Sequence, residues 1–325
     1  MTSDVVSVQV APDDIDDDLI GYWKFDESTG IQAADSSDGE RKTPGMLINF
    51  DNADAERWVA GQIGGALRFD PELQQHVIVN DNMKPSAAVT ASAWVNADAL
   101  ATWGSIIKNW GGAQTGQFHF GLQAGDGDLS NFLTTEDGAI PNTRTSAAFS
   151  TGEWHHVAFT ADGSTMVIYQ DGVALADVAY SGALVDTVIP NLGIGVKTNN
   201  TGEVANGGNP GYWDGLIDDL GLWKRALTPA EIDAIYQAGL RGIPLDRASL
   251  AGPASDPALA IEKNGDKILL SWSIGAEGGW ILTSTTDLAA SIWQAVESEV
   301  VAAGNRNTVT LTPDASTTWY RLERP

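Results

Sequence analysis

Residues 152–173, which read GEWHHVAFTADGSTMVIYQDGV, constrain the possible folds of this chain more than any other stretch. Their side chains alternate with the two-residue period of a β-strand, so Val157 and Phe159 lie on the same face of an extended segment. The Asp-Gly pairs at positions 162–163 and 171–172 predict tight turns, because glycine accepts the positive φ that such turns need. The stretch is therefore predicted to form a β-meander, and the remainder of the chain must supply its partner strands.

The rest of the sequence has the composition of an all-β protein. Many short alternating runs are separated by glycine- and asparagine-containing turns, and the 325 residues include 35 glycines and 12 tryptophans. There is no cysteine, so the core must be stable without disulfide bonds. The length fits one large domain followed by a small one.

Five motifs together resemble a known family. In chain order they are LIGYWKFDESTG, GGALRFD, VTASAWV, the meander described above, and DGLIDDLGLWKRALTPAEI (residues 19–30, 64–70, 89–95, 152–173 and 214–232). This order resembles the laminin-G-like, concanavalin-A-like jelly-roll domain of many secreted bacterial proteins. The resemblance covers residues 19–240 and implies a jelly-roll β-sandwich, but its motifs say little about the ligand.

The sequence divides into four predicted segments. Residues 1–18 are polar and acidic, and they are expected to form a flexible leader. The jelly roll is predicted over 19–240 and a proline-containing linker over 241–257. Residues 258–325 again have strand patterns, and their order of tryptophan and tyrosine motifs resembles a small fibronectin-III-like (immunoglobulin-like) β-sandwich.

Two local predictions are specific. Trp23 and Phe25 share one face of the first strand, where they are expected to anchor the core. Thr228 is followed by proline and, three positions later, by Glu231, which is a capping box. A short helix is therefore expected to begin there and to end at Gly239.

The charge of the chain limits its partners. Against 18 basic residues there are 43 acidic ones, a formal net charge of −25, which argues against nucleic acid and anionic membranes. No apolar run approaches the roughly 20 residues of a membrane span, so membrane insertion is not expected. Met1 is not followed by a signal-peptide pattern. Either the protein is cytosolic, or a signal peptide has been removed. Because the resembled family is mostly extracellular, we expect the second, a secreted or cell-surface protein.

Two loops are candidates for binding. Trp110 lies in the glycine-rich sequence NWGGAQTG between two predicted strands. Its indole could stack on the apolar face of a sugar ring, or it could fold back onto the sandwich; the sequence leaves both readings open. The loop at 197–212 is longer than an ordinary connection and leads to Tyr212 and Trp213.

A carbohydrate site is predicted from these loops and the neighbouring strands. Aromatic side chains would stack on sugar rings while polar ones fix their orientation by hydrogen bonds. Lys108 and Arg144 would favour an acidic or sulfated glycan if they lie close together, although the acidity of the large domain opposes this. The predicted binding residues are Trp103, Lys108, Asn109, Trp110, His119, Arg144, Tyr212 and Trp213.

The resemblance also implies a structural Ca²⁺. Related jelly rolls hold the ion with an aspartate of the closing strand and oxygens from the first strand and an early turn. The matching positions are Asp218 in IDDLGLW and Asp26 in WKFDES, with carbonyls near Gly64. The alternative is that Asp218 faces solvent or caps a turn.

The sequence offers little for catalysis. It lacks the Glu-x-Asp-x-x-Glu strand of jelly-roll glycosidases and the GxSxG, P-loop and HExxH motifs. His155 and His156 are adjacent on a strand and point to opposite faces, so they cannot bind one metal ion together. A non-catalytic, extracellular carbohydrate-binding or adhesion protein is therefore predicted, binding a polysaccharide or glycan. The alternatives are a surface-assembly protein that binds other proteins, and a glycoside hydrolase with an unrecognised site.

Overall fold

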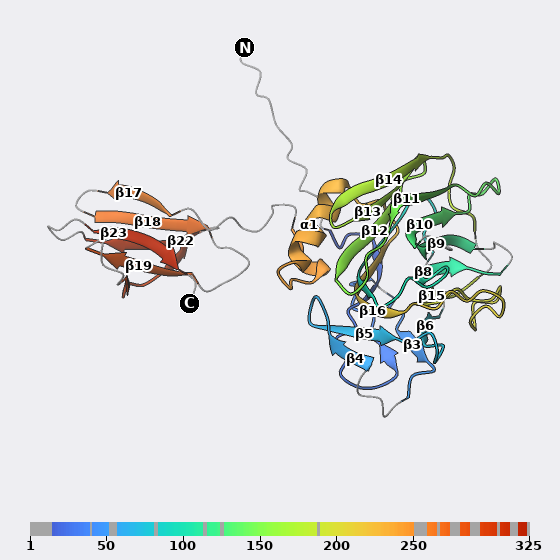
Figure 1. Ribbon diagram of the computed structural model, residues 1–325. Coiled ribbons are helices and arrows are strands. Elements are labelled where there is room, and N and C mark those ends of the chain that lie inside the picture. Colours follow the sequence, from blue (N-terminus) through green and yellow to red (C-terminus); the bar gives the residue numbers. More distant parts are fainter. Residues whose placement is uncertain are drawn as a thin grey trace, which may run out of the picture. The chain divides into compact units, whose positions relative to one another are not determined.

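The computed structural model consists of two compact units, Met1–Leu250 and Ala251–Pro325 (Figure 1). The residues that it describes are 15–39, 41–51, 57–80, 84–112, 116–123, 127–186, 189–249, 259–264, 267–273, 280–286, 293–303, 306–312 and 318–323.

The first unit contains two eight-stranded sheets, and the strand pairs of its described residues are antiparallel. One sheet carries the helix α1 (Pro229–Gly239) on its outer face, and we call it the helix-side sheet. Its strand order is β14-β13-β12-β7-β16-β5-β4, with β1 paired to β16. Its strands are β1 (Leu19–Trp23), β4 (Trp58–Ala60), β5 (Gly65–Phe69), β7 (Val89–Ala97), β12 (His155–Ala161), β13 (Thr165–Gln170), β14 (Val173–Ala179) and β16 (Gly215–Trp223).

We call the other sheet the pocket-side sheet, because the cavity described in the next subsection opens on it. Its strand order is β11-β10-β9-β8-β15-β6-β3-β2. Its strands are β2 (Gln32–Ala33), β3 (Gly45–Ile48), β6 (His76–Val79), β8 (Ser105–Trp110), β9 (Gly116–Leu122), β10 (Asp128–Leu133), β11 (Asn142–Ala148) and β15 (Leu192–Ile194). The prediction of an all-β jelly-roll sandwich is confirmed.

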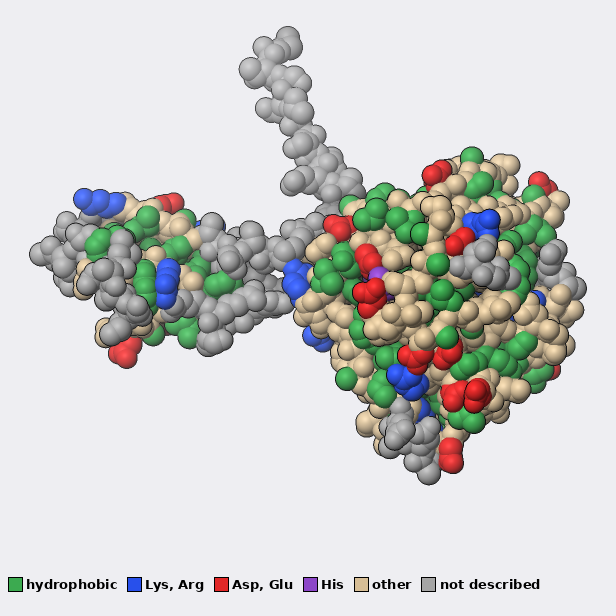
Figure 2. Space-filling model, in the orientation of Figure 1, with side chains coloured by type: hydrophobic (Ala, Val, Ile, Leu, Met, Phe, Trp, Pro, Cys, Tyr) green, Lys and Arg blue, Asp and Glu red, His purple; other side chains and the backbone are tan. Residues whose placement is uncertain are grey.

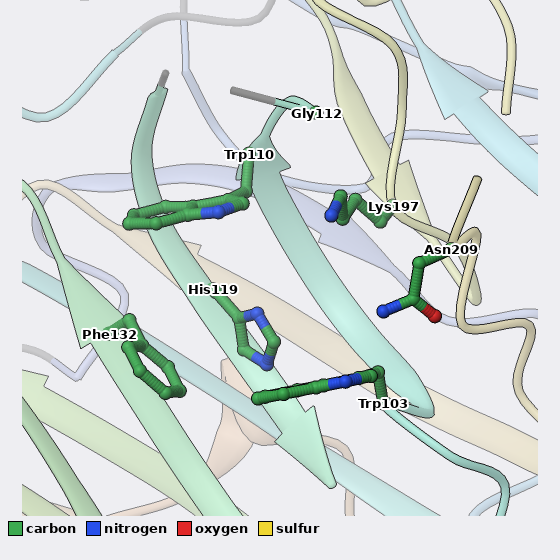
Figure 3. Close-up of a pocket in the computed structure, with 7 residues that line it drawn as sticks. All are labelled: Trp103, Trp110, Gly112, His119, Phe132, Lys197 and Asn209. Carbon is green, nitrogen blue, oxygen red and sulfur yellow. The ribbon is translucent and has the colours of Figure 1, made fainter. Parts of the chain in front are cut away.

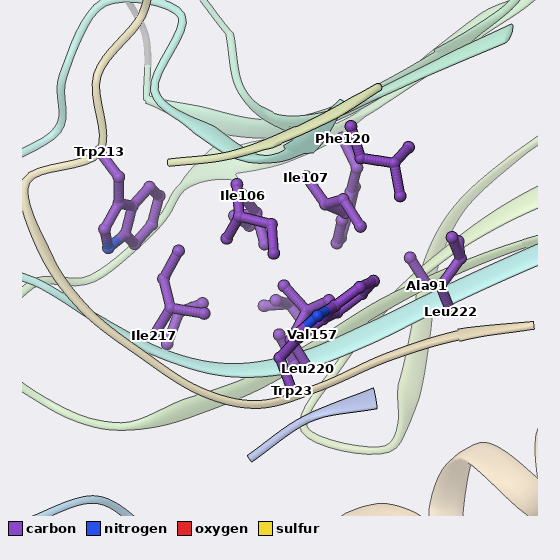
Figure 4. Close-up of a cluster of buried hydrophobic side chains, with 14 of the residues drawn as sticks. Trp23, Ala91, Ile106, Ile107, Phe120, Val157, Trp213, Ile217, Leu220 and Leu222 are labelled. Carbon is purple, nitrogen blue, oxygen red and sulfur yellow. The ribbon is translucent and has the colours of Figure 1, made fainter. Parts of the chain in front are cut away.

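The main core fills the space between the two sheets (Figure 4). Phe159 on β12 meets Phe118 and Phe120 of β9, with ring centroids 5.7 and 5.2 Å apart. Trp23 and Phe25 are fully buried members of the same cluster, so their predicted anchoring role is confirmed. Burying one such aromatic side chain stabilises the folded state by about 1.5–3 kcal/mol.

A second apolar cluster lies on the outer face of the helix-side sheet, under the helix α1 (Pro229–Gly239). Tyr22 and Trp223 from the sheet join Ile232 and Ile235 of the helix in this cluster. The helix begins as predicted, because Thr228 accepts a hydrogen bond from the Glu231 amide while the Glu231 carboxylate accepts one from the Thr228 amide.

The first unit extends beyond the predicted jelly-roll limits of 19 and 240. Ile15 is only 5% exposed, and its carbonyl accepts a 2.7 Å hydrogen bond from the Trp223 indole. Leu245, in the short helix η2 (Leu245–Arg247), is buried and donates its amide to Asp219. The remaining parts of the predicted leader and linker, 1–14 and 250–257, lie outside the described residues.

The predicted β-meander is present as β12, β13 and β14. The two histidines of β12 face opposite sides, as predicted. His156 bonds Ser92 at 2.7 Å, while the His155 Nδ1 lies 2.7 Å from Asp171. The other Asp171 oxygen accepts the His156 amide, so this carboxylate fixes the second turn of the meander to the start of β12. Hydrogen bonding to Asp171 raises the pKa of His155, whereas burial lowers the pKa of His156 to about 4.

The second unit is a small sandwich of two sheets, as predicted. One sheet contains β17 (Ala260–Asn264), β18 (Lys267–Ser273), β22 (Arg306–Leu311) and β21 (Val301–Ala303). The other contains β20 (Gln294–Ala295), β19 (Ile281–Thr285) and β23 (Trp319–Glu323). Leu270, Trp272, Leu282 and Val309 form its buried centre.

The raised pKa of His155 predicts a pH-dependent contribution to stability. Because the folded-state pKa lies above the ordinary histidine value of 6.5, the stabilisation is fully present below pH 6.5 and is lost as the pH rises through the folded-state value. Urea unfolding at a series of pH values should therefore show a difference in unfolding free energy between the wild type and His155→Gln that shrinks as the pH rises above about 6.5. His76→Gln is the matched control, because burial lowers the pKa of His76 and its gap should change in the opposite direction. A His155→Gln gap that stays constant or grows would contradict this assignment.

Candidate functional site

A cavity of about 210 Å³ opens on the pocket-side sheet and is lined largely by aromatic side chains (Figure 3). We call it the aromatic pocket. Figure 3 shows the indoles of Trp103 and Trp110 on two sides of the His119 ring and the Phe132 ring on a third. The lining residues are Trp103, Trp110, Gly112, His119, Phe132, Lys197 and Asn209.

The strand register determines which side chains form the floor of this pocket. Lys108 of β8 is opposite His119 of β9, and His119 is opposite Phe132 of β10. Residues that are directly opposite in a sheet share a face, so these three side chains form one row across three strands. Phe118 and Phe120, the chain neighbours of His119, point to the core instead. The alternation of β9 therefore presents His119 to the pocket.

The rings pack at distances that fix their relative positions. The centroid of His119 lies 5.1 Å from that of Phe132 and 5.8 and 6.4 Å from those of Trp103 and Trp110, both of which meet it edge to face. Trp110 is only 5% exposed, yet its ring lines the cavity. The Trp110 ring is thus packed onto the sheet, as one of the two readings of the sequence expected. It also lines the pocket, and its stacking on a sugar stays a prediction.

The backbone at Trp103 has an uncommon conformation for a bulky residue, with φ at 60°. Its carbonyl accepts a 3.0 Å hydrogen bond from the Lys108 ammonium and a 3.4 Å one from Ser105. Gly211 approaches this carbonyl so closely that a Cβ there would lie 2.2 Å from the oxygen. These contacts hold a strained residue in place, which is a frequent property of functional sites.

The polar groups of the pocket are cationic or neutral. Burial lowers the pKa of His119 and Lys108, and the positive charges of Lys108 and Lys197 lower the pKa of His119 further. The Nε2 of His119 is buried and has no hydrogen-bond partner within the described part of the chain. The described residues that line the pocket include no aspartate or glutamate. Such a site can donate hydrogen bonds and stack rings.

The structure brings together part of the predicted carbohydrate site. Trp103, Trp110 and His119 line the pocket, and Lys108 lies beneath Trp103. Asn109 is buried and donates its amide to the carbonyls of residues 189 and 191, so it holds the backbone. Arg144 is exposed on β11, 3.8 Å from Asp128, and it does not line the pocket.

Two predicted aromatic platforms lie elsewhere. Trp213 is 0% exposed and belongs to the main core, so the prediction that it stacks on a sugar is wrong. Its ring packs among the apolar residues of the core just before β16, and its indole N–H donates a 3.2 Å hydrogen bond to the Leu216 carbonyl. Tyr212 lines a separate cavity of about 490 Å³, where its ring lies 5.8 Å from that of His76.

The sequence did not single out Phe132, Lys197 or Asn209. The length of the loop at 197–212 was a usable signal, since both Lys197 and Asn209 lie on it. For Phe132 no comparable signal exists, because the face that it occupies depends on the pairing of β10 with β9.

The three residues of the predicted calcium site also lie together, around a turn at 61–65. Asp26 accepts the Gly65 amide at 2.6 Å, and Asp218 accepts the Ile63 amide at 2.8 Å. A Cβ on Gly64 would lie 2.3 Å from an Asp26 oxygen, so only glycine fits against this carboxylate. The Oδ1 atom of Asp218 is buried without a partner among the described residues.

The electrostatics of this turn disfavour an isolated charge on Asp218. Burial raises its pKa to about 9, and the nearby carboxylates of Asp219 and Asp26 contribute in the same direction. No cluster of three or more acidic, histidine or cysteine side chains suited to a metal occurs within the described ranges. Any cation here would need backbone carbonyls or water beside these carboxylates.

Comparison with known proteins identifies a matching family model. The model described as "Concanavalin A-like lectin/glucanases superfamily" matches residues 71–233, just over half of the 325 residues. Comparison with the sequences of curated proteins finds no significant match.

Solved structures with a similar fold include domain 4 of AbnA, an extracellular GH43 arabinanase from Geobacillus stearothermophilus, in complex with arabinotriose. It is 23% identical with a TM-score of 0.51, and the match covers 67% of this chain and 98% of that domain. The receptor-binding domain of botulinum neurotoxin mosaic serotype C/D is 13% identical (TM-score 0.48, 93% of this chain, 80% of the other). Trypanosoma rangeli sialidase is 14% identical (TM-score 0.44, 70% and 34%). The AbnA similarity concerns the fold alone, and the two weaker ones carry no further argument.

The different positions of Trp213 and Trp103 predict different effects on stability. Trp213→Ala should lower the free energy of unfolding by about 3–5 kcal/mol, because it removes a fully buried ring from the core. Trp103→Ala should cost less than half as much, because its ring is half-exposed at the pocket. Urea unfolding of the full chain, followed by circular dichroism, measures both. Equal losses would contradict the assignment of Trp213 to the core and Trp103 to the pocket.

Proposed function

The chain belongs to the concanavalin A-like lectin/glucanase superfamily, and from this premise we propose that it is a non-catalytic carbohydrate-binding protein whose site is the aromatic pocket. The observation that carries the proposal is the enclosure of His119 by three aromatic rings, with a buried ring nitrogen that lacks a partner among the described residues. Buried polar atoms are normally hydrogen-bonded, so an unpartnered one in a pocket favours a ligand or water there.

The pocket matches the chemistry of a sugar. A pyranose or furanose ring has an apolar face that stacks on an indole and hydroxyl groups that accept hydrogen bonds. Trp103 and Trp110 offer the ring surfaces, while Lys197 and Asn209 lie on the side across from Phe132 (Figure 3). The volume of about 210 Å³ is below the roughly 300 Å³ of sites for drug-sized ligands, which favours a single sugar residue in the pocket.

A binding role is favoured over hydrolysis, although the superfamily includes both lectins and glucanases. Most glycoside hydrolases use two carboxylates on either side of the scissile bond. The described lining of the aromatic pocket contains none. Ser150, His155 and Asp171 are hydrogen-bonded in series, but none of them lines this pocket.

We place the protein outside the cell, as a secreted or surface-attached glycan-binding or adhesion module. The similar AbnA domain comes from an enzyme whose description is extracellular. Within the described ranges no helix has the length and apolar character of a membrane span.

Glycan binding should depend on the Trp110 ring. Affinity electrophoresis against a panel of polysaccharides should show retardation of the wild type by at least one glycan. Trp110→Ala should weaken that binding about tenfold or more, because removing ring surface that a sugar covers costs about 1.5 kcal/mol or more. Tyr236→Ala is the matched control, since it removes a half-buried aromatic ring from α1 that stacks on Trp94 instead.

Two outcomes would contradict the proposal. Absence of retardation by any glycan, with the protein folded, would favour a protein partner on a cell surface. Release of reducing sugars from a retarding glycan would instead show hydrolysis, and the site would then have to be sought among the carboxylates elsewhere in the first unit.

We further propose that a structural Ca²⁺ binds at the turn formed by residues 61–65. The residues present fit the ion, because the unpartnered Asp218 oxygen is buried and the Asp26 carboxylate lies beside the same turn. Ca²⁺ takes six to eight oxygen ligands, so carbonyls such as that of Gly64 and water would complete the set. The ion would favour the ionised form of Asp218 and link the segment that follows β1, the turn and β16.

Calcium should therefore stabilise the first unit. At a free concentration of about one hundred times its Kd, an ion that binds only the folded state adds about 2.7 kcal/mol, or about 5–10 °C in Tm for a domain of this size. Thermal unfolding in calcium and in chelator measures the difference. Asp218→Asn should abolish it, while Asp18→Asn, which alters an exposed carboxylate paired with Lys224, should retain it. A wild type with no shift, or an Asp218→Asn variant with a full one, would sink the proposal.

A further inference from the structure

We infer that the aromatic pocket selects a sugar residue that carries an anionic group, a carboxylate or a sulfate, and that Lys197 pairs with that group. This inference rests on the proposed glycan-binding function and adds the chemical class of the ligand. The described lining of the pocket holds a lysine and no carboxylate, whereas the unit that contains it is strongly acidic.

The first unit is strongly acidic. Residues 252–325 hold nine acidic and five basic residues, so residues 1–251 hold 34 acidic and 13 basic ones, a net charge of −21. Figure 2 shows acidic side chains in several groups on the visible face of this unit. The aromatic pocket departs from this pattern, because its described lining includes Lys197 and His119 and no carboxylate.

Lys197 differs from several other basic residues of the unit in having no paired carboxylate. Lys24 pairs with Asp246 at 2.8 Å, Lys224 with Asp18 at 3.1 Å, and Arg225 with Glu231 at 2.6 Å. The Lys197 ammonium makes no ion pair with any carboxylate of the described residues. In a unit with 34 acidic residues, an unpaired and half-buried lysine at the wall of a pocket is available for a ligand.

Lys108 adds a second cationic group near the first. It is fully buried, its ammonium has a hydrogen bond to the Trp103 carbonyl, and it lies opposite His119 in the sheet. Proximity to Lys197 lowers the pKa of Lys108 beyond the effect of burial, so the two ammonium groups repel each other. A buried ammonium without a counter-charge is costly, and an anion in the pocket would offset both the burial and the repulsion.

The negative charge of the whole unit opposes an acidic ligand, but only at long range. At physiological ionic strength the Debye length is about 8 Å, so carboxylates farther away are largely screened. Groups in direct contact inside a partly enclosed pocket are screened much less. The local lysines therefore decide which ligand is preferred once it has reached the pocket.

Matched pairs of glycans test the inference on the full chain. Polygalacturonate is compared with its fully methyl-esterified form, and a sulfated galactan with its desulfated form, by calorimetry or affinity electrophoresis. One charged form should bind at least about tenfold more tightly than its neutral counterpart, since charge-assisted hydrogen bonds are the stronger kind. Whichever pair shows the difference identifies the group as carboxylate or sulfate.

The substitution Lys197→Gln tests whether Lys197 pairs with the anionic group. It should weaken binding of the charged form about tenfold and leave binding of the neutral form within about twofold, thereby removing the preference. Lys224→Gln is the control, because it makes the same change in net charge at an exposed pair near α1. Circular dichroism and Tm should show that both variants are folded.

The outcomes separate this inference from the function on which it rests. Equal binding of charged and neutral forms, unchanged in Lys197→Gln but weakened in Trp110→Ala, would overturn the anionic preference and leave the glycan site in place. A preference for charged forms that survives both Lys197→Gln and Trp110→Ala would place the anion site elsewhere. Absence of binding to every glycan would overturn both proposals.

Discussion

The two-residue alternation of the strands is the constraint on which both the core and the candidate site depend. In β9, Phe118 and Phe120 are buried against Phe159 of the opposite sheet, while His119 between them faces the pocket. A slip of one residue in register would exchange these faces, placing an imidazole in an apolar core and phenylalanines in the pocket. Core packing therefore holds His119 at its place, and the pocket needs little stabilisation of its own.

The buried and half-buried carboxylates of the first unit accept hydrogen bonds that hold its strands and turns together. Asp171 accepts hydrogen bonds from both histidines of β12 and so organises the meander. Asp219, buried under α1, accepts from the Tyr22 hydroxyl and the Leu245 amide, and burial raises its pKa to about 7. These side chains are structural, so the net charge of the unit is a poor guide to the charge of its ligand.

Features that depend on neighbours in the chain could be predicted from the sequence. The turns of the meander and the capping box at Thr228 are set by residues at most a few positions apart, and both are present. The jelly-roll class followed from the order of five motifs. Trp103, Trp110 and His119 were predicted because side chains that suit a sugar occur there in or beside a glycine-rich loop, whereas Phe132 resembles any core aromatic until the register of β10 is known.

The unit boundaries were harder to predict for a related reason. Ile15 lies in an acidic stretch and Leu245 in a proline-containing one, and both compositions are typical of exposed segments. Their burial depends on single tertiary contacts, namely the Trp223 indole with the Ile15 carbonyl and the Leu245 amide with Asp219. Such contacts involve residues about 208 and 26 positions apart, beyond the reach of local patterns.

Trp213, which was wrongly predicted to stack on a sugar, instead supports the loop at 197–212. Its amide donates to the Gly195 carbonyl at 3.0 Å, and its ring is buried in the core, so the end of the loop is fixed beside its beginning. Inside this closure, the Lys197 amide donates to the Pro210 carbonyl at 2.7 Å, which ties the two arms of the loop together. Because both Lys197 and Asn209 lie on these arms, Trp213 positions one wall of the pocket without touching a ligand. A tryptophan beside a binding loop can thus serve the site through the core, and its exposure in the folded chain decides which role it has.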